Sequence, residues 1–243
     1  MLPHSLNIIR DYLDNYQPPI GSFDPSAEWE HRYVMWIALR GNAGKSWPGG
    51  ALNIRRRLGE SGRIKLEVDQ VTSLRGPGGT GHTRATLTCA SDRLSTPQTW
   101  EIESEIVNNQ GQSVDYTRVK VNGEVASGKI VCRGAAERRM KAPKSFASNW
   151  SLFDAVQRLP LDAKPISFDL LEDLELLKPN HRLEYRQSVE LKLGERTARL
   201  HGFEQIGEGI LPYMYWLDEQ HRLLFAVGGL RTFLLEPNAE DAL

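Results

Sequence analysis

The stretch WIALRGNAGKSW (residues 36–47) carries the residue types of a phosphate-binding loop, because a glycine-rich turn ends in Lys45 and Ser46. A loop of the GxxxxGK[ST] type needs a further glycine at the position that Leu39 occupies here, and it must run directly into a helix whose amides hold the phosphate. The residues that follow are Trp47-Pro48 and two glycines, and then the alternating run ALNIRRRL. The stretch therefore predicts a connection between two antiparallel strands and no nucleotide site.

Three histidines could supply metal ligands, since His181, His201 and His221 recur every 20 residues in what reads as a series of strands. Against a metal site, His181 and His221 fall in the turn-like segments KPNH and DEQH, and no HxH or HxxxH pair offers two ligands from one element. We therefore predict no metal. The two cysteines, Cys89 and Cys132, lie in strand-like runs, where buried free thiols are the commoner outcome, but their pairing stays open.

Catalytic signatures are equally sparse. There is no GxSxG elbow after a strand and no cysteine with a histidine signature nearby. Four carboxylates lie within ISFDLLEDLELL (residues 166–177), but an acid/base pair is recognised by its spatial separation, which the sequence does not contain. We name no catalytic residue and no cofactor, and an enzyme with unrecognised acid/base residues stays an alternative.

Large aromatic side chains spread over the predicted strands and one predicted helix are the most informative remaining feature. They could fill a core, or they could line a cleft between a sheet and a helix, because ligand pockets use the same residue types. The residues we expect to line such a cleft are Trp100, Trp150, Phe153, Tyr185 and Tyr215.

The elements that must position these residues are mainly strands. Apolar and charged residues alternate over 64–69, 100–106, 118–121 and 189–193, which is the pattern of antiparallel strands with one buried face. Turn residues separate these runs, and Asn122-Gly123 is the strongest local hairpin signal because both residues tolerate a positive φ. The fold class predicted is mainly β: a large curled antiparallel sheet, either a half-barrel or a sandwich.

Two helices interrupt this pattern. Residues 5–16 read as a short amphipathic helix that Pro18-Pro19 ends, and residues 148–159 read as a second helix with Ser148 or Asn149 as its N-cap. We expect the second helix to lay its aromatic face on the sheet, after a basic crossover loop at 133–144. The expected organisation is an N-terminal helix and linker over 1–20 and a single β-rich domain over 21–243.

Composition sets limits on the partners. The 243 residues are 40% hydrophobic and 25% charged, with 30 basic and 31 acidic side chains and a net charge of −1. This balance gives no global attraction to nucleic acid, and no run approaches the roughly 20 apolar residues of a membrane span. The first residues also lack the basic start and apolar run of a secretory signal. We expect a soluble, cytoplasmic protein, or a bacterial envelope protein if a signal has been removed.

The closing segment, residues 209–236, resembles the ending of uncharacterised bacterial β-rich proteins of unknown function. The residues that carry this likeness are Tyr215, Trp216, Leu217, Asp218, Glu219, Arg222, Leu223 and Leu224. The helical run SLFDAVQRLP and the run KPNHRLEYR are similar, so the likeness covers the C-terminal ~100 residues. Such proteins are similar to the lipoprotein-carrier half-barrel, a curled sheet that holds acyl chains in the bacterial envelope. The resemblance implies export, from which this chain departs because it shows no signal segment.

Three functions stay open on this reading. The leading one is a non-catalytic binding or carrier protein, which holds a lipid-like or other apolar or amphipathic small molecule between the sheet and a helix. The second is a protein-interaction or assembly module that uses a sheet edge or the aromatic face. The third is the unrecognised enzyme. The oligomeric state is not predicted.

Overall fold

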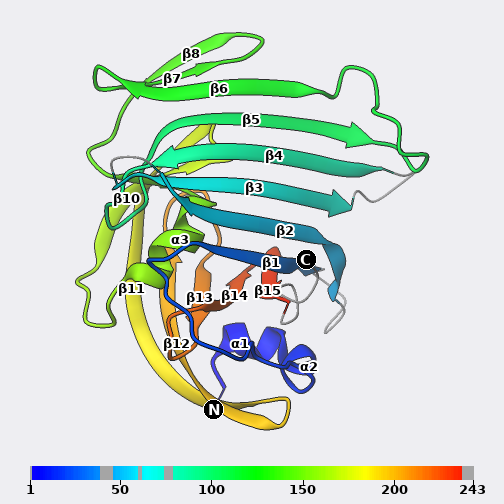
Figure 1. The fold of residues 1–243 in the computed structure, drawn as a ribbon, viewed down its shortest axis with the longest axis vertical. Coiled ribbons are helices and arrows are strands. Elements are labelled where there is room, and N and C mark those ends of the chain that lie inside the picture. The colour runs from blue at the N-terminus through cyan, green and yellow to red at the C-terminus, as the bar shows by residue number, and fades with distance from the viewer. Residues whose placement is uncertain (1, 39–45, 60–61, 74–78, 237–243) are drawn as a thin grey trace.

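The computed structural model describes residues 2–38, 46–59, 62–73 and 79–236 (Figure 1). The helices are α1 (His4–Ile8), α2 (Arg10–Leu13) and α3 (Ser151–Arg158). The strands of the first half are β1 (Trp29–Ala38), β2 (Ser46–Leu58), β3 (Ile64–Ser73), β4 (Thr80–Cys89), β5 (Pro97–Val107), β6 (Val119–Ala126), β7 (Lys129–Arg133) and β8 (Glu137–Lys141). Those of the second half are β9 (Phe146–Ser148), β10 (Ile166–Glu172), β11 (Leu176–Leu193), β12 (Arg196–Ile206), β13 (Tyr213–Leu217), β14 (Leu223–Gly228) and β15 (Arg231–Leu235).

All fifteen strands belong to one sheet in the order β8-β7-β6-β5-β4-β3-β2-β1-β15-β14-β13-β12-β11-β10-β9. Two meanders, β1–β8 and β9–β15, join where β1 pairs with β15, and every pairing is antiparallel except that of β9 with β10. That parallel pair needs a crossover connection, and α3 supplies it. The prediction of a mainly β fold with a large curled sheet is confirmed.

The sheet is strongly curled (Figure 1), and side-chain contacts join the regions near its two ends. Strands β8 and β9 lie at opposite ends of the strand order, but along the chain only residues 142–145 connect them. An ion pair of 2.8 Å joins Arg138 of β8 to Glu175 of the β10–β11 turn, and the Cys132 thiol donates to the Leu174 carbonyl at 3.7 Å. Bulges, such as that between Tyr185 and Gln187, increase the local bend of long strands.

The strands at the centre of the sheet are covered on both faces, and β14 is therefore buried at every position. On the concave face Phe153 of α3 packs edge-on against Tyr215. On the other face Trp216 donates its indole N–H to Ser5 at 3.1 Å, and Phe225 contacts Tyr16 at 4.9 Å between ring centroids. The predicted single helix over 5–16 is wrong in detail, because α1 and α2 are two short helices. No helix in the described ranges is long and apolar enough to cross a bilayer.

Helix α3 is shorter than the predicted 148–159, and every residue from Ser151 to Gln157 is buried. The assigned boundary of α3 puts the N-cap position at Trp150, which already has helical φ and ψ and makes no side-chain capping hydrogen bond. Ser148 still organises the entry to the helix: the Ser151 amide donates to its hydroxyl, and its own amide donates to the Ser151 hydroxyl, both at 2.9 Å. This is the reciprocal arrangement of a capping box.

Two turn predictions are wrong. Asn122-Gly123 lies inside β6, and the β6–β7 turn is Ser127-Gly128, where both residues have a positive φ. Gly123 is needed for packing, because a Cβ there would lie 2.0 Å from Cε2 of Trp100. The expected crossover loop at 133–144 contains an entire strand, β8, and only its last residues form the connection. The strands on either side of the glycine-rich stretch in WIALRGNAGKSW are present as predicted, whereas residues 39–45 lie outside the described residues.

Candidate functional site

A cavity of about 600 Å³ lies between the concave face of the sheet and the N-terminal end of α3. Its size falls within the range of small-molecule sites, about 300–1,000 Å³. The cavity is lined by Leu52, Gln70, Asn149, Trp150, Phe153, Leu170, Glu172, Asp173, Lys178, Gln205, Gly209, Ile210, Leu211, Tyr213, Tyr215, Gly229, Leu230, Arg231 and Phe233. These residues come from both meanders, so the space exists only because the sheet curls.

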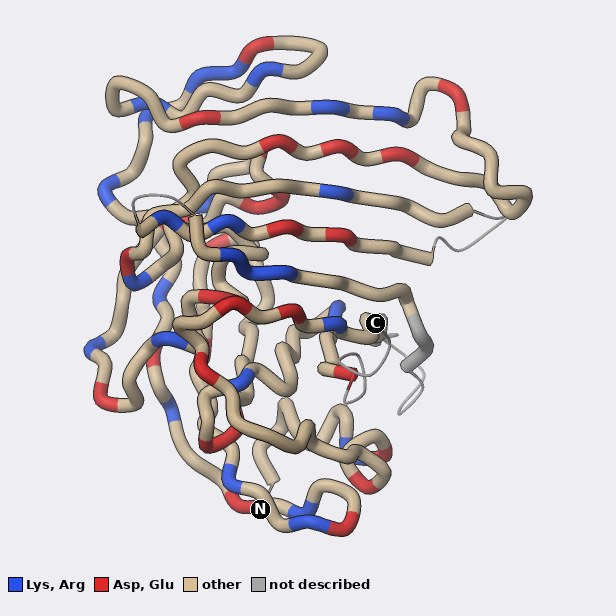
Figure 2. The backbone as a smooth tube through the Cα atoms, in the orientation of Figure 1, with Lys and Arg blue, Asp and Glu red and all other residues tan. Residues whose placement is uncertain are grey.

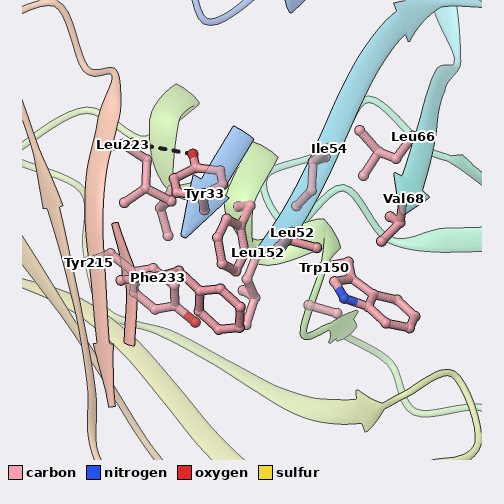
Figure 3. Packing of buried hydrophobic residues seen from close by; sticks show 14 of the residues in the cluster. Tyr33, Leu52, Ile54, Leu66, Val68, Trp150, Leu152, Tyr215, Leu223 and Phe233 are labelled. Atoms are coloured by element: carbon pink, nitrogen blue, oxygen red, sulfur yellow. Dashed lines mark hydrogen bonds between the residues drawn. The ribbon is translucent and has the colours of Figure 1, made fainter. Parts of the chain in front are cut away.

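Five aromatic and five aliphatic side chains form the apolar part of the cavity wall. Trp150 and Phe153 stand one helical turn apart at the start of α3, and the Phe153 ring packs edge-on against Tyr215 of β13 and Phe233 of β15. Figure 3 shows Tyr215 and Phe233 on one side of this region and Trp150 on the other, with Leu52 between them. Because the strand residues alternate in direction, each strand contributes every second side chain to this wall.

Neutral polar groups lie on the floor of the cavity. The Tyr215 hydroxyl donates to Oε1 of Gln205 at 2.7 Å, and Nε2 of Gln205 is 3.2 Å from Nδ1 of His181. Since the amide NH₂ can only donate, this contact leaves His181 neutral with its proton on Nε2. Burial raises the pKa of Tyr215 well above its ordinary value. On the opposite wall Trp150 donates its indole N–H to Oε1 of Gln70 at 3.3 Å. The floor therefore offers hydroxyl and amide groups held in fixed orientations.

Charged groups lie at the mouth of the cavity. Lys178 forms an ion pair of 2.6 Å with Glu172 and donates to the Gly209 carbonyl at 2.9 Å. Asp173 exchanges hydrogen bonds with the Asn149 side chain at 3.0 and 3.1 Å. Partial removal from water, followed by the Glu172 charge, raises the pKa of Asp173, although much of this residue is exposed. The mouth is therefore polar where the interior is apolar.

Apolar side chains also reach the surface at this mouth. Leu211 and Leu230 are 39% and 55% exposed and belong to two neighbouring loops. A Cβ on Gly229 would lie 2.4 Å from Cδ1 of Leu211, so the two loops pack against each other only because residue 229 is a glycine. The Tyr213 hydroxyl donates a hydrogen bond to the Arg231 carbonyl at 2.9 Å, which fixes the end of the loop that contains Gly229 and Leu230.

The five residues predicted to line a cleft divide into two groups. Trp150, Phe153 and Tyr215 line the cavity together. Trp100 is buried against Gly123 on β6, and Tyr185 packs on Phe203 and contacts the Ser188 hydroxyl at 2.8 Å, so neither lines the cavity. Whether any of the five contacts a ligand stays a prediction.

The lining residues that the sequence did not suggest are mainly polar or lie in loops, for example Gln70, Gln205 and the segment 209–211. Neither glutamine has a distinctive neighbour in the sequence. The one signal was the alternation of side chains along the strand, because Gln205 lies two residues after Phe203 and therefore points to the same face of the sheet. Gln205 also pairs with Tyr213 of the neighbouring strand.

A buried charge network holds α3 in place beside the cavity. Asp154 accepts hydrogen bonds from Nε of Arg56 at 2.7 Å, from Nε of Arg158 at 3.0 Å and from the Ser95 hydroxyl. Arg56 also donates to the carbonyls of Ser26 and Ala27, and its side chain is 4% exposed. All of these contacts occupy the carboxylate, so Asp154 acts as an anchor for the helix.

The histidines and cysteines do not gather at the cavity. The expectation that His181 lies in a turn is wrong: it lies within β11 and is 1% exposed. His201 lies 6.1 Å from His221 between ring centroids. In the part of the chain that the structure describes, no three His, Cys, Asp or Glu side chains are placed to hold a metal. Cys89 and Cys132 are buried free thiols, which answers the open question of their pairing.

Comparison with known proteins identifies the fold and no family. No protein-family model matches the sequence, and no curated protein matches it. Among solved structures, the chain is similar to a beta-barrel-like protein of domain of unknown function DUF1849 from Brucella abortus, with a TM-score of 0.55 and 9% sequence identity. The match covers 86% of this chain and 96% of that one. The likeness confirms the coarser part of the sequence-based resemblance: this chain has the β-rich, barrel-like fold of an uncharacterised protein.

Proposed function

We propose that the protein is a non-catalytic binding or carrier protein for one amphipathic small molecule, which it holds between α3 and the concave face of the sheet. The observation that carries this proposal is the cavity itself, which combines aromatic side chains and neutral polar groups with charged groups that keep part of their surface exposed. Ligand sites have this composition, a predominantly apolar lining with a few polar groups that fix orientation.

The distribution of polar groups defines the kind of ligand. Apolar ligand surface that enters the cavity would contribute about 25 cal/mol per Å² of buried area. The inner end of the ligand would be uncharged, since an unpaired charge next to Phe153 and Tyr215 would be strongly disfavoured. It could bond to the Gln205 amide, whereas the polar end would remain at the mouth near Lys178 and Arg231.

The edges of the sheet do not favour the alternative of an assembly module. Strand β8, at one edge, carries Glu137, Arg138 and Arg139, and charged edges are a known means of preventing edge-to-edge pairing. At the other edge, all three residues of β9 are buried. A partner strand would meet charge at one edge and would have only a short, covered strand at the other.

Binding can be tested by titration with Nile red, an uncharged probe whose fluorescence increases in apolar surroundings. We expect saturable binding with one probe per chain. Leu230→Glu should weaken it about tenfold or more, because it replaces an apolar side chain that borders the cavity with a carboxylate. Leu176→Glu is a matched control: Leu176 is 56% exposed, against 55% for Leu230, and does not line the cavity. Equal binding by both variants, or no saturable binding by the wild type, would contradict the proposal.

A further inference from the structure

The first meander neutralises its surface charges strand by strand. Figure 2 shows acidic residues on β5 beside basic residues on β4 and β6. Lys120 of β6, for example, lies 2.7 Å from Glu101 of β5, and Arg133 of β7 lies 2.7 Å from Glu124 of β6. Among the lysines and arginines that lie inside strands β2 to β8, as far as these are described, all have a carboxylate within 4.0 Å except Lys129 and Lys141.

These two lysines face each other. Lys129 and Lys141 are direct partners in the antiparallel register of β7 and β8, and both are exposed. The ladder continues past them, since the Ala142 amide donates to the Gly128 carbonyl at 2.9 Å, so the backbone holds the two positions opposite each other. Like charges directly across a ladder are destabilising, and this pair has no internal counter-charge in the part of the chain that is described.

A groove of about 670 Å³ begins at Lys141, one member of this pair. It lies where the ends of the sheet meet, between the connection 141–145 and the β10–β11 hairpin, and none of its lining residues lines the apolar cavity. The groove is lined by Lys141, Ala142, Pro143, Lys144, Ser145, Ser167, Phe168, Asp169, Leu177, Asn180, His181 and Arg182.

The charges of this groove are predominantly positive. Lys141 and Lys144 are exposed, and neither has a carboxylate within 4.0 Å among the described residues. Arg182 shares one N–H with Glu184, which leaves other guanidinium donors. The single acid in the lining, Asp169, already accepts the Asn180 amide at 3.2 Å. Burial lowers the pKa of His181, so this histidine adds no positive charge at neutral pH.

We propose that this groove is a second binding site and that it takes a phosphate group. Two ammonium groups and one guanidinium on three different segments match a tetrahedral oxyanion with several acceptor oxygens, and charge-assisted hydrogen bonds of this kind are among the stronger ones. A bound phosphate would also supply the counter-charge that Lys141 lacks, and it would thereby reduce the repulsion between Lys141 and its cross-strand partner Lys129. The proposal does not depend on the function assigned to the cavity.

Phosphate in the groove could belong to a soluble molecule or to a lipid headgroup, and two assays separate these sources. The first is calorimetric titration with inorganic phosphate and with glycerol 3-phosphate. The second is flotation with phosphatidylcholine vesicles that contain phosphatidylglycerol, at low and at high salt. Saturable binding in solution identifies a soluble ligand, and salt-sensitive flotation without binding in solution identifies a headgroup.

Lys141→Glu is the informative variant, because it exchanges the repulsion with Lys129 for a cross-strand ion pair. We expect at least about tenfold weaker binding with a melting temperature equal to or above that of the wild type. Lys144→Gln, on the exposed connection, should also weaken binding. Lys192→Glu is the control, since Lys192 is exposed on β11 outside the groove. No binding in either assay, or wild-type binding by the Lys141 and Lys144 variants, would overturn the proposal.

Discussion

Removing the Asp154 carboxylate should destabilise the protein more than removing any exposed ion pair. In Asp154→Ala, Arg56 loses the only carboxylate that lies within 4.0 Å of it among the described residues. Its side chain is 4% exposed and keeps hydrogen bonds to the carbonyls of Ser26 and Ala27. Breaking a buried pair in this way costs about 3–5 kcal/mol. Arg158 adds little, because its side chain is 17% exposed and water can replace part of the lost contact.

The free energy of unfolding can be measured by urea denaturation followed by circular dichroism. Glu101→Ala is the exposed control: it removes the partner of Lys120, both side chains are about half exposed, and the loss should be under about 1 kcal/mol. The double variant Arg56→Met/Asp154→Leu should be more stable than Asp154→Ala, because no buried charge is left without a partner. A loss below about 1 kcal/mol in Asp154→Ala would refute the assignment of this network as the anchor of α3.

Three further predictions follow from buried groups. Burial, and then the Arg222 charge, lower the pKa of His31 to about 3. Below about pH 6.5 the unfolded chain therefore binds a proton at His31 that the folded chain does not bind. The free energy of unfolding should fall by up to about 1.4 kcal/mol per pH unit in this range. His31→Gln should flatten this slope between about pH 6.5 and 5, and an unchanged slope would show that other groups cause it. Gly123→Ala should cost about 1–3 kcal/mol in urea denaturation, because its Cβ would overlap the Trp100 ring, and a neutral effect would contradict the packing of β6 on β5. Cys89 and Cys132 should resist a thiol reagent in the native state and react in denaturant, because burial raises the pKa of both thiols; rapid native labelling would show that one of them is exposed.

The alternation of apolar and charged residues in the sequence predicted the strands that have one face exposed to solvent. The alternation over 64–69 and 100–106 corresponds to β3 and β5; burial alternates in the same way over 64–69 and over 100–102, whereas residues 103–107 are all half-buried. The pattern carries no such information for β14, because both of its faces are covered by segments distant in sequence. The hairpin signal of Asn122-Gly123 was misleading for a related reason: the glycine serves a long-range contact with Trp100 and not a turn.

The residues of the candidate site could be predicted from the sequence only where neighbouring residues of a single helix or strand contribute them. Trp150 and Phe153 lie three residues apart at the start of a helix, so their common face follows from helical periodicity. Tyr185 and Tyr215 look alike in the sequence, and only the curl of the sheet and the register of β11 to β13 bring Tyr215 to the cavity. The groove at Lys141 and Lys144 was equally hidden, because it requires the two ends of the sheet to meet.

The central claim is that the space between α3 and the sheet holds a small amphipathic molecule. Native mass spectrometry of the protein purified from its own host tests this claim most directly. We predict a fraction of the protein with one added small-molecule mass, which dissociates on activation and is reduced in Leu230→Glu but retained in Leu176→Glu. A wild-type protein that carries only its own mass, and that also fails to bind Nile red, would contradict the account.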